Sequence, residues 1–234
     1  MIPVSVILPT YNEADNIIPL IQEILIQVPR ESEVIVVDDN SPDGTSKAVE
    51  AFGQKDSRVR LNRRIGRKGL TSALQEGINS AQGRVVVWMD CDFSMPPDKI
   101  PELIQTLEEN DIAVASRYVP GGEEMGHSPL GSFLSRLICR LSSLVLGPSI
   151  KDYTSGFIAI GRDVLKTLPL RGDYGEYFID LMYRASQKGY RIKEIPYRCR
   201  QRRSGESKTA TDLWGYMKRG RKYLATIVRL RLGR

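Results

Sequence analysis

The sequence predicts an α/β fold with a mostly parallel central sheet. Over the first 116 residues, short runs of consecutive apolar residues alternate with longer segments in which apolar residues recur at helical spacing. Strands that are buried on both faces and joined by crossover helices have this pattern. The chain has 234 residues, 41% hydrophobic and 26% charged, so it is long enough to bury a substantial core.

Seven short segments are expected to form the strands of the sheet. Four apolar runs predict buried strands, a shorter run predicts a fifth, and two more follow after the rhythm changes near residue 116. In chain order these strands cover 4–8, 34–37, 59–61, 85–89, 112–115, 157–160 and 192–197. Ligands of such sheets bind beyond the carboxyl ends of the strands, so motifs that follow strands are candidates for the site.

Helices are expected between and after these strands. Thr45 and Ser94 are placed to cap two early helices at their N-termini, and Gly189 is placed to end a later one. Residues 120–122 form a loop that precedes an amphipathic helix. The expected helices cover 16–28, 46–52, 70–80, 97–109, 130–146, 177–188 and 211–232.

The domain organisation follows from charge and hydropathy. We expect one domain over 1–210 and a basic amphipathic helix over 211–234. Residues 200–234 hold 11 Lys and Arg against 2 Asp and Glu, whereas residues 1–199 hold 23 against 26. Such a tail binds nucleic acid, anionic lipid or a phosphorylated substrate, or it is only a solvated helix face. The sequence has no apolar run of about 18 residues and no signal-peptide pattern, so we expect no membrane span.

The three cysteines and the single histidine, His127, limit the chemistry. An odd number of widely spaced cysteines argues for a reducing compartment and against a disulfide framework or zinc site. One histidine argues against a histidine triad or a multi-histidine metal centre. Any metal is therefore expected on carboxylates, which favour Mg²⁺ or Mn²⁺.

Paired acids follow two of the expected strands. Asp38 and Asp39 precede a Pro-Asp-Gly turn, where they accept hydrogen bonds from a ribose or base, or only begin the turn. Asp90 and Asp92 follow the run at 85–89. Residues i and i+2 of an extended chain point the same way, so these two carboxylates can share one divalent cation on a diphosphate.

Seven motifs in order carry a resemblance to a known family. Together they resemble the family 2 glycosyltransferases, and within them the polyprenyl-phosphate (dolichyl-phosphate) mannose synthases. The resemblance runs from Pro3 to about Lys208 and implies a GT-A-type nucleotide-sugar-binding domain with amphipathic helices in the C-terminal half. The motifs lie at 9–13, 36–45, 67–70, 90–97, 115–122, 152–157 and 205–208.

The resemblance also implies roles for individual residues. The catalytic residues it implies are Asp90, Asp92 and Arg117. The metal, Mg or Mn, is held by Asp90 and Asp92, with Ser94 at the place where many members have a Gln that assists the metal. The implied donor-binding residues are Pro9, Tyr11, Glu13, Val37, Asp39, Asp90, Cys91 and Asp92. The implied acceptor-phosphate residues are Arg117, Arg136, Arg202 and Lys208.

A further departure lies at the start of the amphipathic segment 130–146. Many members have paired arginines there, whereas this chain has Ser135 and Arg136. One contact to the acceptor phosphate is therefore expected to be missing.

The implied activity is metal-dependent transfer of mannose from GDP-mannose to dolichyl or polyprenyl phosphate, with inversion at the sugar. The acceptor phosphate is anionic near pH 7, so a strong general base is not required. We expect a peripheral protein on the cytoplasmic face of a membrane, held by segment 130–146, by the tail helix or by a small membrane-anchoring subunit. Some relatives continue into transmembrane helices, so a truncated chain is the other explanation. The tail is expected to leave the active site unchanged.

Two alternatives within the same class stay open. One is a polyprenyl-phosphate glucosyltransferase that uses UDP-glucose, and the other is a family 2 transferase with a non-lipid acceptor. A basic nucleic-acid-binding protein is disfavoured, because the body lacks basic–aromatic platforms and its paired acids repel phosphate. We therefore expect no nucleic-acid partner.

Overall fold

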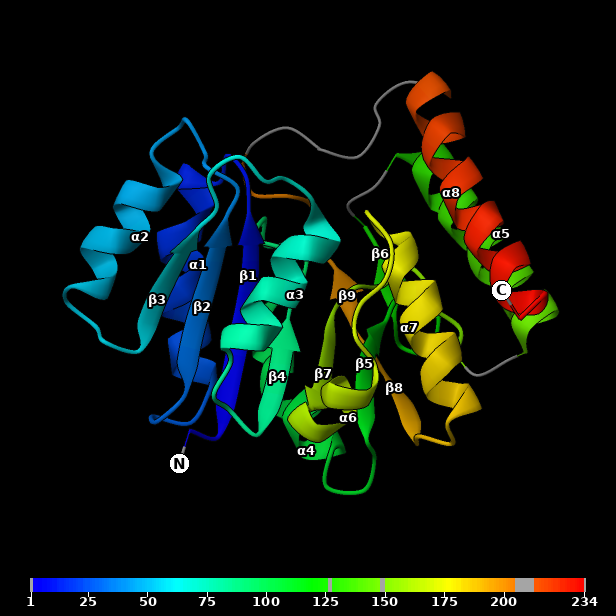
Figure 1. Cartoon of the computed structure of the whole chain (residues 1–234), viewed down its shortest axis with the longest axis horizontal. Helices are drawn as coiled ribbons and strands as arrows, with labels where there is room; N and C mark the ends of the chain where they lie inside the picture. The colour runs from blue at the N-terminus through cyan, green and yellow to red at the C-terminus, as the bar shows by residue number, and fades with distance from the viewer. Residues whose placement is uncertain (1, 126–127, 148–149, 205–212, 234) are drawn as a thin grey trace.

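A seven-stranded sheet organises the fold (Figure 1). The computed structural model describes residues 2–125, 128–147, 150–204 and 213–233, with side chains of the last segment described from 219. The strand order is β3-β2-β1-β4-β7-β5-β8, and every neighbouring pair is parallel except those of β7 with β4 and β5. The strands of this sheet are β1 (Val4–Thr10), β2 (Glu33–Asp38), β3 (Val59–Arg63), β4 (Val85–Trp88), β5 (Ile112–Ser116), β7 (Ile158–Gly161) and β8 (Ile192–Pro196). A separate parallel ribbon joins β6 (Glu123–Glu124) to β9 (Arg198–Cys199).

Helices cover both faces of the sheet. In Figure 1, α3 and α7 lie in front of the strands and α1 lies behind them, while α5 and α8 stand side by side at the end of the sheet. The helices are α1 (Ala14–Gln27), α2 (Thr45–Gly53), α3 (Leu70–Ser80), α4 (Ile100–Thr106) after a 3-10 turn η1 (Pro97–Lys99), α5 (Pro129–Leu146), α6 (Arg162–Thr167), α7 (Glu176–Gln187) and α8 (Leu213–Arg231).

Alternation along the strands produces two hydrophobic cores. Val6 and Leu8 of β1 face α1, α2 and α4, whereas Ile7 faces α3 and the core that continues to α7. Successive side chains of a strand point to opposite faces, so a continuous apolar run fills both layers. The runs that predicted the strands therefore also explain why both faces are covered.

The sequence placed most elements within a few residues of where they lie, and the differences have local causes. β1 continues through Thr10, so Pro9 pairs within the sheet instead of beginning a loop. β7 is antiparallel and interrupts an otherwise parallel sheet, which apolar spacing alone cannot reveal. Gly189 follows α7 with φ 78°, in agreement with its expected role as a helix stop. The expectations did not include α6, β6 or β9.

Both expected N-caps are wrong. The N-cap of α2 is Gly44, which has φ 96°, and Thr45 is the first helical residue. Asp43 supplies the missing cap, because its carboxylate accepts hydrogen bonds from the Thr45 backbone N–H at 3.0 Å and hydroxyl at 2.6 Å. Ser94 does not cap a helix, since the turn that begins the next helical segment starts after Pro96.

Two long helices, α5 and α8, close one end of the sheet. Ile227 and Leu230 of α8 are buried in the same core as α7, so the C-terminal helix packs on the sheet domain. Among the described residues, one helix, α5, is long and apolar enough to cross a membrane, with mean hydropathy 1.3 and 17% of its residues buried. The sequence expectation counted uninterrupted apolar runs, which Arg136 and Arg140 break. Helices of soluble proteins also reach this length and composition.

Candidate active site

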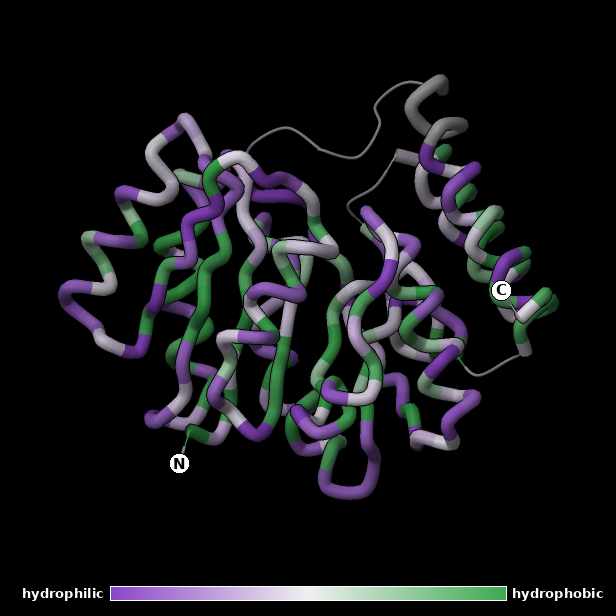
Figure 2. Tube along the Cα trace, in the orientation of Figure 1, coloured by the Kyte–Doolittle hydropathy of each residue, from purple (hydrophilic) through white to green (hydrophobic). Residues whose placement is uncertain are grey.

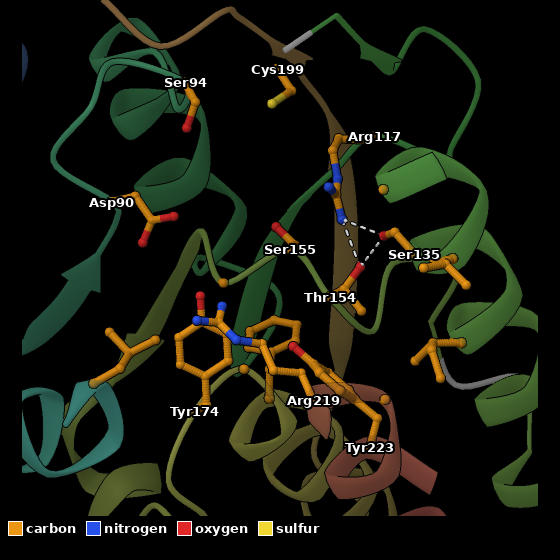
Figure 3. Close-up of a pocket in the computed structure, with 18 of the residues that line it drawn as sticks. Asp90, Ser94, Arg117, Ser135, Thr154, Ser155, Tyr174, Cys199, Arg219 and Tyr223 are labelled. Carbon is orange, nitrogen blue, oxygen red and sulfur yellow. Dashed lines mark hydrogen bonds between the residues drawn. The ribbon is translucent and has the colours of Figure 1, made fainter. Parts of the chain in front are cut away.

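A cavity of about 980 Å³ lies beyond the carboxyl ends of β4 and β5. In Figure 3, Asp90 and Ser94 occupy one side, Arg117, Ser135 and Thr154 the opposite side, and Tyr174, Arg219 and Tyr223 the floor. Apart from Ser135, the side formed by α5 is apolar. The apolar side chains of α5 that line it are Leu130, Leu134, Leu137, Ile138 and Leu141. The cavity therefore joins a carboxylate wall to a hydrocarbon wall.

The carboxylate wall follows β4. Asp90 is exposed and its carboxylate points into the cavity (Figure 3). Asp92 is buried: its Oδ1 accepts a hydrogen bond from the Ser94 backbone N–H at 2.9 Å, and its Oδ2 lies 2.7 Å from Nη2 of Arg202. Arg202 also reaches Glu13 at 3.7 Å. One arginine thus connects the acidic pair after β4 with the loop after β1.

The backbone at Phe93 holds these two acids in place. Phe93 has φ 66°, which is strained for a bulky residue and costs on the order of 1–3 kcal/mol. The segment after β9 stabilises it: Arg203 N–H donates to the Asp92 carbonyl at 3.0 Å, and Arg200 N–H donates to the Ser94 carbonyl at 2.9 Å. The loop conformation that presents Asp90 and Asp92 therefore depends on a segment more than 100 residues away.

Arg117 lies inside a cluster of compensating charges. Its guanidinium donates to Asp152 at 2.8 Å, to Glu124 at 3.0 Å and to the Thr154 hydroxyl at 2.7 Å. Ser135 accepts from Tyr118 at 2.9 Å at the edge of the same cluster. The resemblance implied a catalytic or acceptor-binding arginine here, and the geometry is that of a buried ion network.

The charges of this cluster stabilise each other. Burial raises the pKa of the Asp152 carboxyl, but the Arg117 guanidinium more than offsets this and holds the pKa below its usual value. Burial likewise lowers the pKa of Arg117, and Asp152 returns it to well above the usual value. Both groups are therefore charged at neutral pH.

A second network orders the loops beside β1 and β2. Asp38 is fully buried, and its carboxylate accepts hydrogen bonds from the Thr10 hydroxyl at 3.0 Å and from the Ser41 hydroxyl at 2.5 Å. Asp38 therefore stabilises the turn that follows β2. Asp39 accepts from Arg64 Nε at 2.7 Å and from the Gly69 backbone N–H at 2.8 Å. This fixes the loop after β3, which is the loop that carries Lys68.

Lys68 is a basic residue that lies beside Tyr11, one of the residues expected to bind the nucleotide donor. Its Nζ lies 4.3 Å from the ring centroid of Tyr11 and donates to the Tyr11 hydroxyl at 3.0 Å. The motif at 67–70 is part of the family resemblance, but the sequence predicts no role for Lys68 or Arg64. The available signal in the sequence was that the motif at 67–70, with its basic residues and glycine, follows closely after the strand β3.

The structure brings part of the expected site together. The expected residues that line the cavity are Asp90, Asp92, Ser94, Arg117 and Arg202. The remaining donor residues lie in the neighbouring loops and strand ends, where Val37 is fully buried and the Cys91 thiol donates to the Pro9 carbonyl at 3.4 Å. Arg136 is largely exposed and lies 4.0 Å from Glu124. Lys208 lies outside the described residues.

The tail helix is part of the cavity, contrary to the expectation that it leaves the site unchanged. Arg219, Tyr223 and Leu224 of α8 line the cavity. From sequence, residues 211–234 are expected to form a basic amphipathic helix, either at a membrane surface or packed on the domain with a solvated basic face. The spacing of Tyr223, Ile227 and Leu230, which share one helix face, was the available signal.

The fold is that of a GT-A-type glycosyltransferase. Residues 5–168 match the family model described as Glycosyl transferase family 2, and the chain belongs to this family. It is 32% identical over 219 residues to an undecaprenyl-phosphate mannosyltransferase of Micrococcus luteus, with 91% of this chain and 89% of that protein covered. It is 35% identical over 211 residues to a polyprenol monophosphomannose synthase of Mycolicibacterium smegmatis, with 87% and 79% covered.

A similar solved structure is glucosyl-3-phosphoglycerate synthase from Mycobacterium tuberculosis, in complex with Mn²⁺, UDP and glucosyl-3-phosphoglycerate. The TM-score is 0.75 at 24% identity, with 99% of this chain and 80% of that chain covered. This likeness concerns the fold.

Proposed function

We propose that this enzyme transfers mannose from GDP-mannose to a polyprenyl phosphate, with inversion at the sugar. The observation that carries the proposal is the cavity, which has acids along one wall and the apolar face of α5 along another. Such a cavity suits an acceptor with a phosphate head and a hydrocarbon chain. The names of the two mannosyltransferase relatives support the sugar and the lipid acceptor.

The donor is proposed to bind across the ends of β1, β2 and β4. The base would lie near the Tyr11 ring, which Lys68 already covers from one side. Glu13 is held by Asn16 at 2.8 Å, so its carboxylate has a fixed direction at the edge of this loop. The diphosphate would then extend toward Asp90, where the carboxylate wall begins.

The residues at the acidic wall fit a divalent metal. Asp90, Asp92 and Ser94 offer two carboxylates and a hydroxyl, which are the oxygen donors that Mg²⁺ and Mn²⁺ prefer. Within the described residues no group of three or more acidic, histidine or cysteine side chains gathers that could hold a metal ion. An ion on Asp90 and Asp92 would therefore take its other ligands from a diphosphate and water. When bound, the ion would neutralise charge on the departing nucleoside diphosphate.

The protein's own contribution to the chemistry is positioning. A phosphate acceptor is ionised near pH 7 and attacks without losing a proton, so no side chain has to act as a strong base. Rate acceleration then rests on holding the phosphate in line with the anomeric carbon, opposite the leaving diphosphate. The apolar wall of α5 would fix the acceptor chain and exclude water from this line.

We further propose that α5 and α8 bind the membrane surface that contains the acceptor. Phe133 and Leu144 of α5 are 63% and 82% exposed, and Val228 of α8 is also exposed. Figure 2 shows hydrophobic residues along both helices, on the part of the molecule that also borders the cavity. Exposed apolar side chains beside basic residues are typical of helices that lie at a lipid interface.

A transfer assay tests the proposed reaction. Radiolabelled GDP-mannose and UDP-glucose are each incubated with polyprenyl phosphate in detergent, and with 3-phosphoglycerate as a soluble acceptor. We expect mannosyl transfer to polyprenyl phosphate that EDTA abolishes and Asp90→Asn nearly abolishes. Glu108→Gln, an exposed acid after α4, is the control and should keep full activity. Transfer from UDP-glucose alone, or to phosphoglycerate alone, would replace the proposal with one of its two alternatives.

Sedimentation with anionic liposomes tests the membrane surface. The double variant Phe133→Asp with Leu144→Asp should leave most of the protein in the supernatant, whereas wild type pellets. Ile26→Asp is the matched control, because Ile26 is 78% exposed on α1, away from the cavity. Equal pelleting of all three proteins would reject α5 as the lipid-binding face.

A further inference from the structure

Tyr177 is a buried tyrosine in the first turn of α7, and its side chain lines the cavity. It is 2% exposed, and its ring packs edge-to-face on Phe178 with a centroid distance of 6.0 Å. Burial raises the pKa of its hydroxyl well above the usual value, and the charge of the Asp90 carboxylate raises this pKa further. The hydroxyl therefore keeps its proton at neutral pH and lies within electrostatic reach of Asp90.

The Trp88 indole determines how the Tyr177 hydroxyl can use its proton. Trp88 Nε1–H donates to the Tyr177 oxygen at 2.9 Å, and both side chains are buried. An indole N–H is only a donor, so the tyrosine oxygen has to accept here and its own O–H remains for a second hydrogen bond. Within the part of the chain that the structure describes, no group accepts this O–H. A buried hydroxyl with an unused proton beside a cavity is typical of a site that binds an acceptor atom of a ligand.

Open space lies next to this hydroxyl. Gly156 lines the cavity with φ 73°, and a Cβ added there would lie 3.8 Å from the Tyr177 oxygen and 3.9 Å from the Met95 methyl carbon. These are the nearest atoms outside residues 155–157. The Met95 sulfur in turn accepts a hydrogen bond from the Asp90 backbone N–H at 3.2 Å. The space is therefore bordered by the hydroxyl, by an apolar methyl group and by the segment that carries Asp90.

We infer that the Tyr177 hydroxyl donates a hydrogen bond to a hydroxyl oxygen of the donor sugar, an inference that rests on the proposed function. The donor diphosphate is proposed to reach Asp90, and the sugar is joined to that diphosphate, so the sugar enters the space beside Met95 and Tyr177. A neutral O–H donor among apolar groups suits a sugar hydroxyl, whereas phosphates are bound mainly by cations. Tyr177 would thus help to select the sugar, because a buried donor left without its acceptor disfavours the wrong one.

Calorimetric binding without acceptor tests the inference. Tyr177→Phe keeps the ring and removes the hydroxyl, so with Mg²⁺ present it should bind GDP-mannose about five- to tenfold more weakly than wild type, as expected for loss of one neutral hydrogen bond. Its affinity for GDP, which lacks the mannose, should stay within about twofold of the wild-type value. The matched control is Tyr183→Phe, the same change on α7 at a tyrosine outside the described cavity lining, and it should bind both ligands as wild type does.

Deoxy donors distinguish a sugar contact from a structural role of Tyr177. GDP-mannose analogues that lack the 2-, 3-, 4- or 6-hydroxyl of the mannose are each bound to wild type and to Tyr177→Phe. One analogue should bind the two proteins with equal affinity, because it already lacks the contacted hydroxyl, while the others retain the difference seen with GDP-mannose. A difference of the same size for every analogue, or no difference for GDP-mannose itself, overturns the inference.

Gly156→Ala provides a second, independent test, and urea unfolding of each variant identifies a folding defect. Its methyl group would enter the space next to the Tyr177 hydroxyl, so GDP-mannose should bind at least about fivefold more weakly while GDP affinity stays within about twofold. Wild-type mannosyl transfer together with unchanged GDP-mannose binding in Gly156→Ala overturns this inference alone. Wild-type enzyme that transfers no mannose to polyprenyl phosphate overturns the proposed function, and this inference with it.

Discussion

Replacing Arg117 with methionine distinguishes a structural arginine from a substrate-binding one. The side chains of Arg117, Asp152 and Glu124 are 6%, 0% and 1% exposed, and the arginine joins the two acids. Methionine has a similar length but leaves Asp152 buried without its cation and removes from Glu124 the nearer of two arginines. We therefore expect the main effect of Arg117→Met on the free energy of unfolding.

The magnitude follows from the burial of the acids. Breaking a buried ion pair by removing one partner costs about 3–5 kcal/mol, because the remaining charge is left desolvated. With an m-value of about 3 kcal/mol per molar for a chain of this size, the urea midpoint should fall by about 1–1.7 M. Asp152→Asn alone should also destabilise, and the double variant should lose about 1–3 kcal/mol less than the sum of the two.

The loss of unfolding free energy in Arg117→Met should be larger at neutral pH than at acidic pH. The pKa of Asp152 is lowered in the folded protein, so its pairing stabilises the fold above the unfolded pKa, about 3.9, and this stability is lost as the pH falls through the folded pKa. The difference between wild type and Arg117→Met should therefore be largest near pH 7 and shrink below about pH 4. Urea unfolding followed by fluorescence at both pH values measures it.

A different result would assign Arg117 to the substrate. Suppose that the free energy of unfolding of Arg117→Met is within about 0.5 kcal/mol of the wild-type value and that the variant has lost transferase activity. The main role of Arg117 would then be in substrate binding or catalysis and not in stabilising the ion network. An additive double variant with Asp152→Asn would contradict the coupling between the two residues in the same way.

Three further predictions follow from close contacts. Gly77→Ala should lower the unfolding free energy by about 1–3 kcal/mol in urea titrations, because a Cβ on α3 would collide with side chains of β1 and β2. Gly175→Ala should destabilise by a similar amount, since its Cβ would meet the Tyr223 hydroxyl, and adding Tyr223→Phe should restore most of the loss. Lys68→Gln should weaken calorimetric GDP binding about two- to fivefold, through loss of the cation over Tyr11, without shifting the urea midpoint.

The sequence by itself determined the sheet and the location of the acids. Apolar runs buried on both faces permit few alternatives to a layered α/β domain, and motifs after strands necessarily collect at one edge of a parallel sheet. Asp90, Asp92 and Ser94 could therefore be placed together before any coordinate was known, and they line one cavity. Residues that lie in one short segment after a strand stay close together in the fold, because the local backbone geometry fixes their relative positions.

Only the tertiary structure decided which charged side chains lie next to one another. The pairing of Arg117 with Asp152 spans 35 residues, and α8 brings Arg219 to the floor of a cavity whose acids lie more than 120 residues earlier. Spacing along the chain carries no record of such contacts, since they depend on how helices pack and on which carboxylate is desolvated beside which arginine. A basic residue can be recognised from sequence, but its availability to a phosphate depends on the acids that folding places around it.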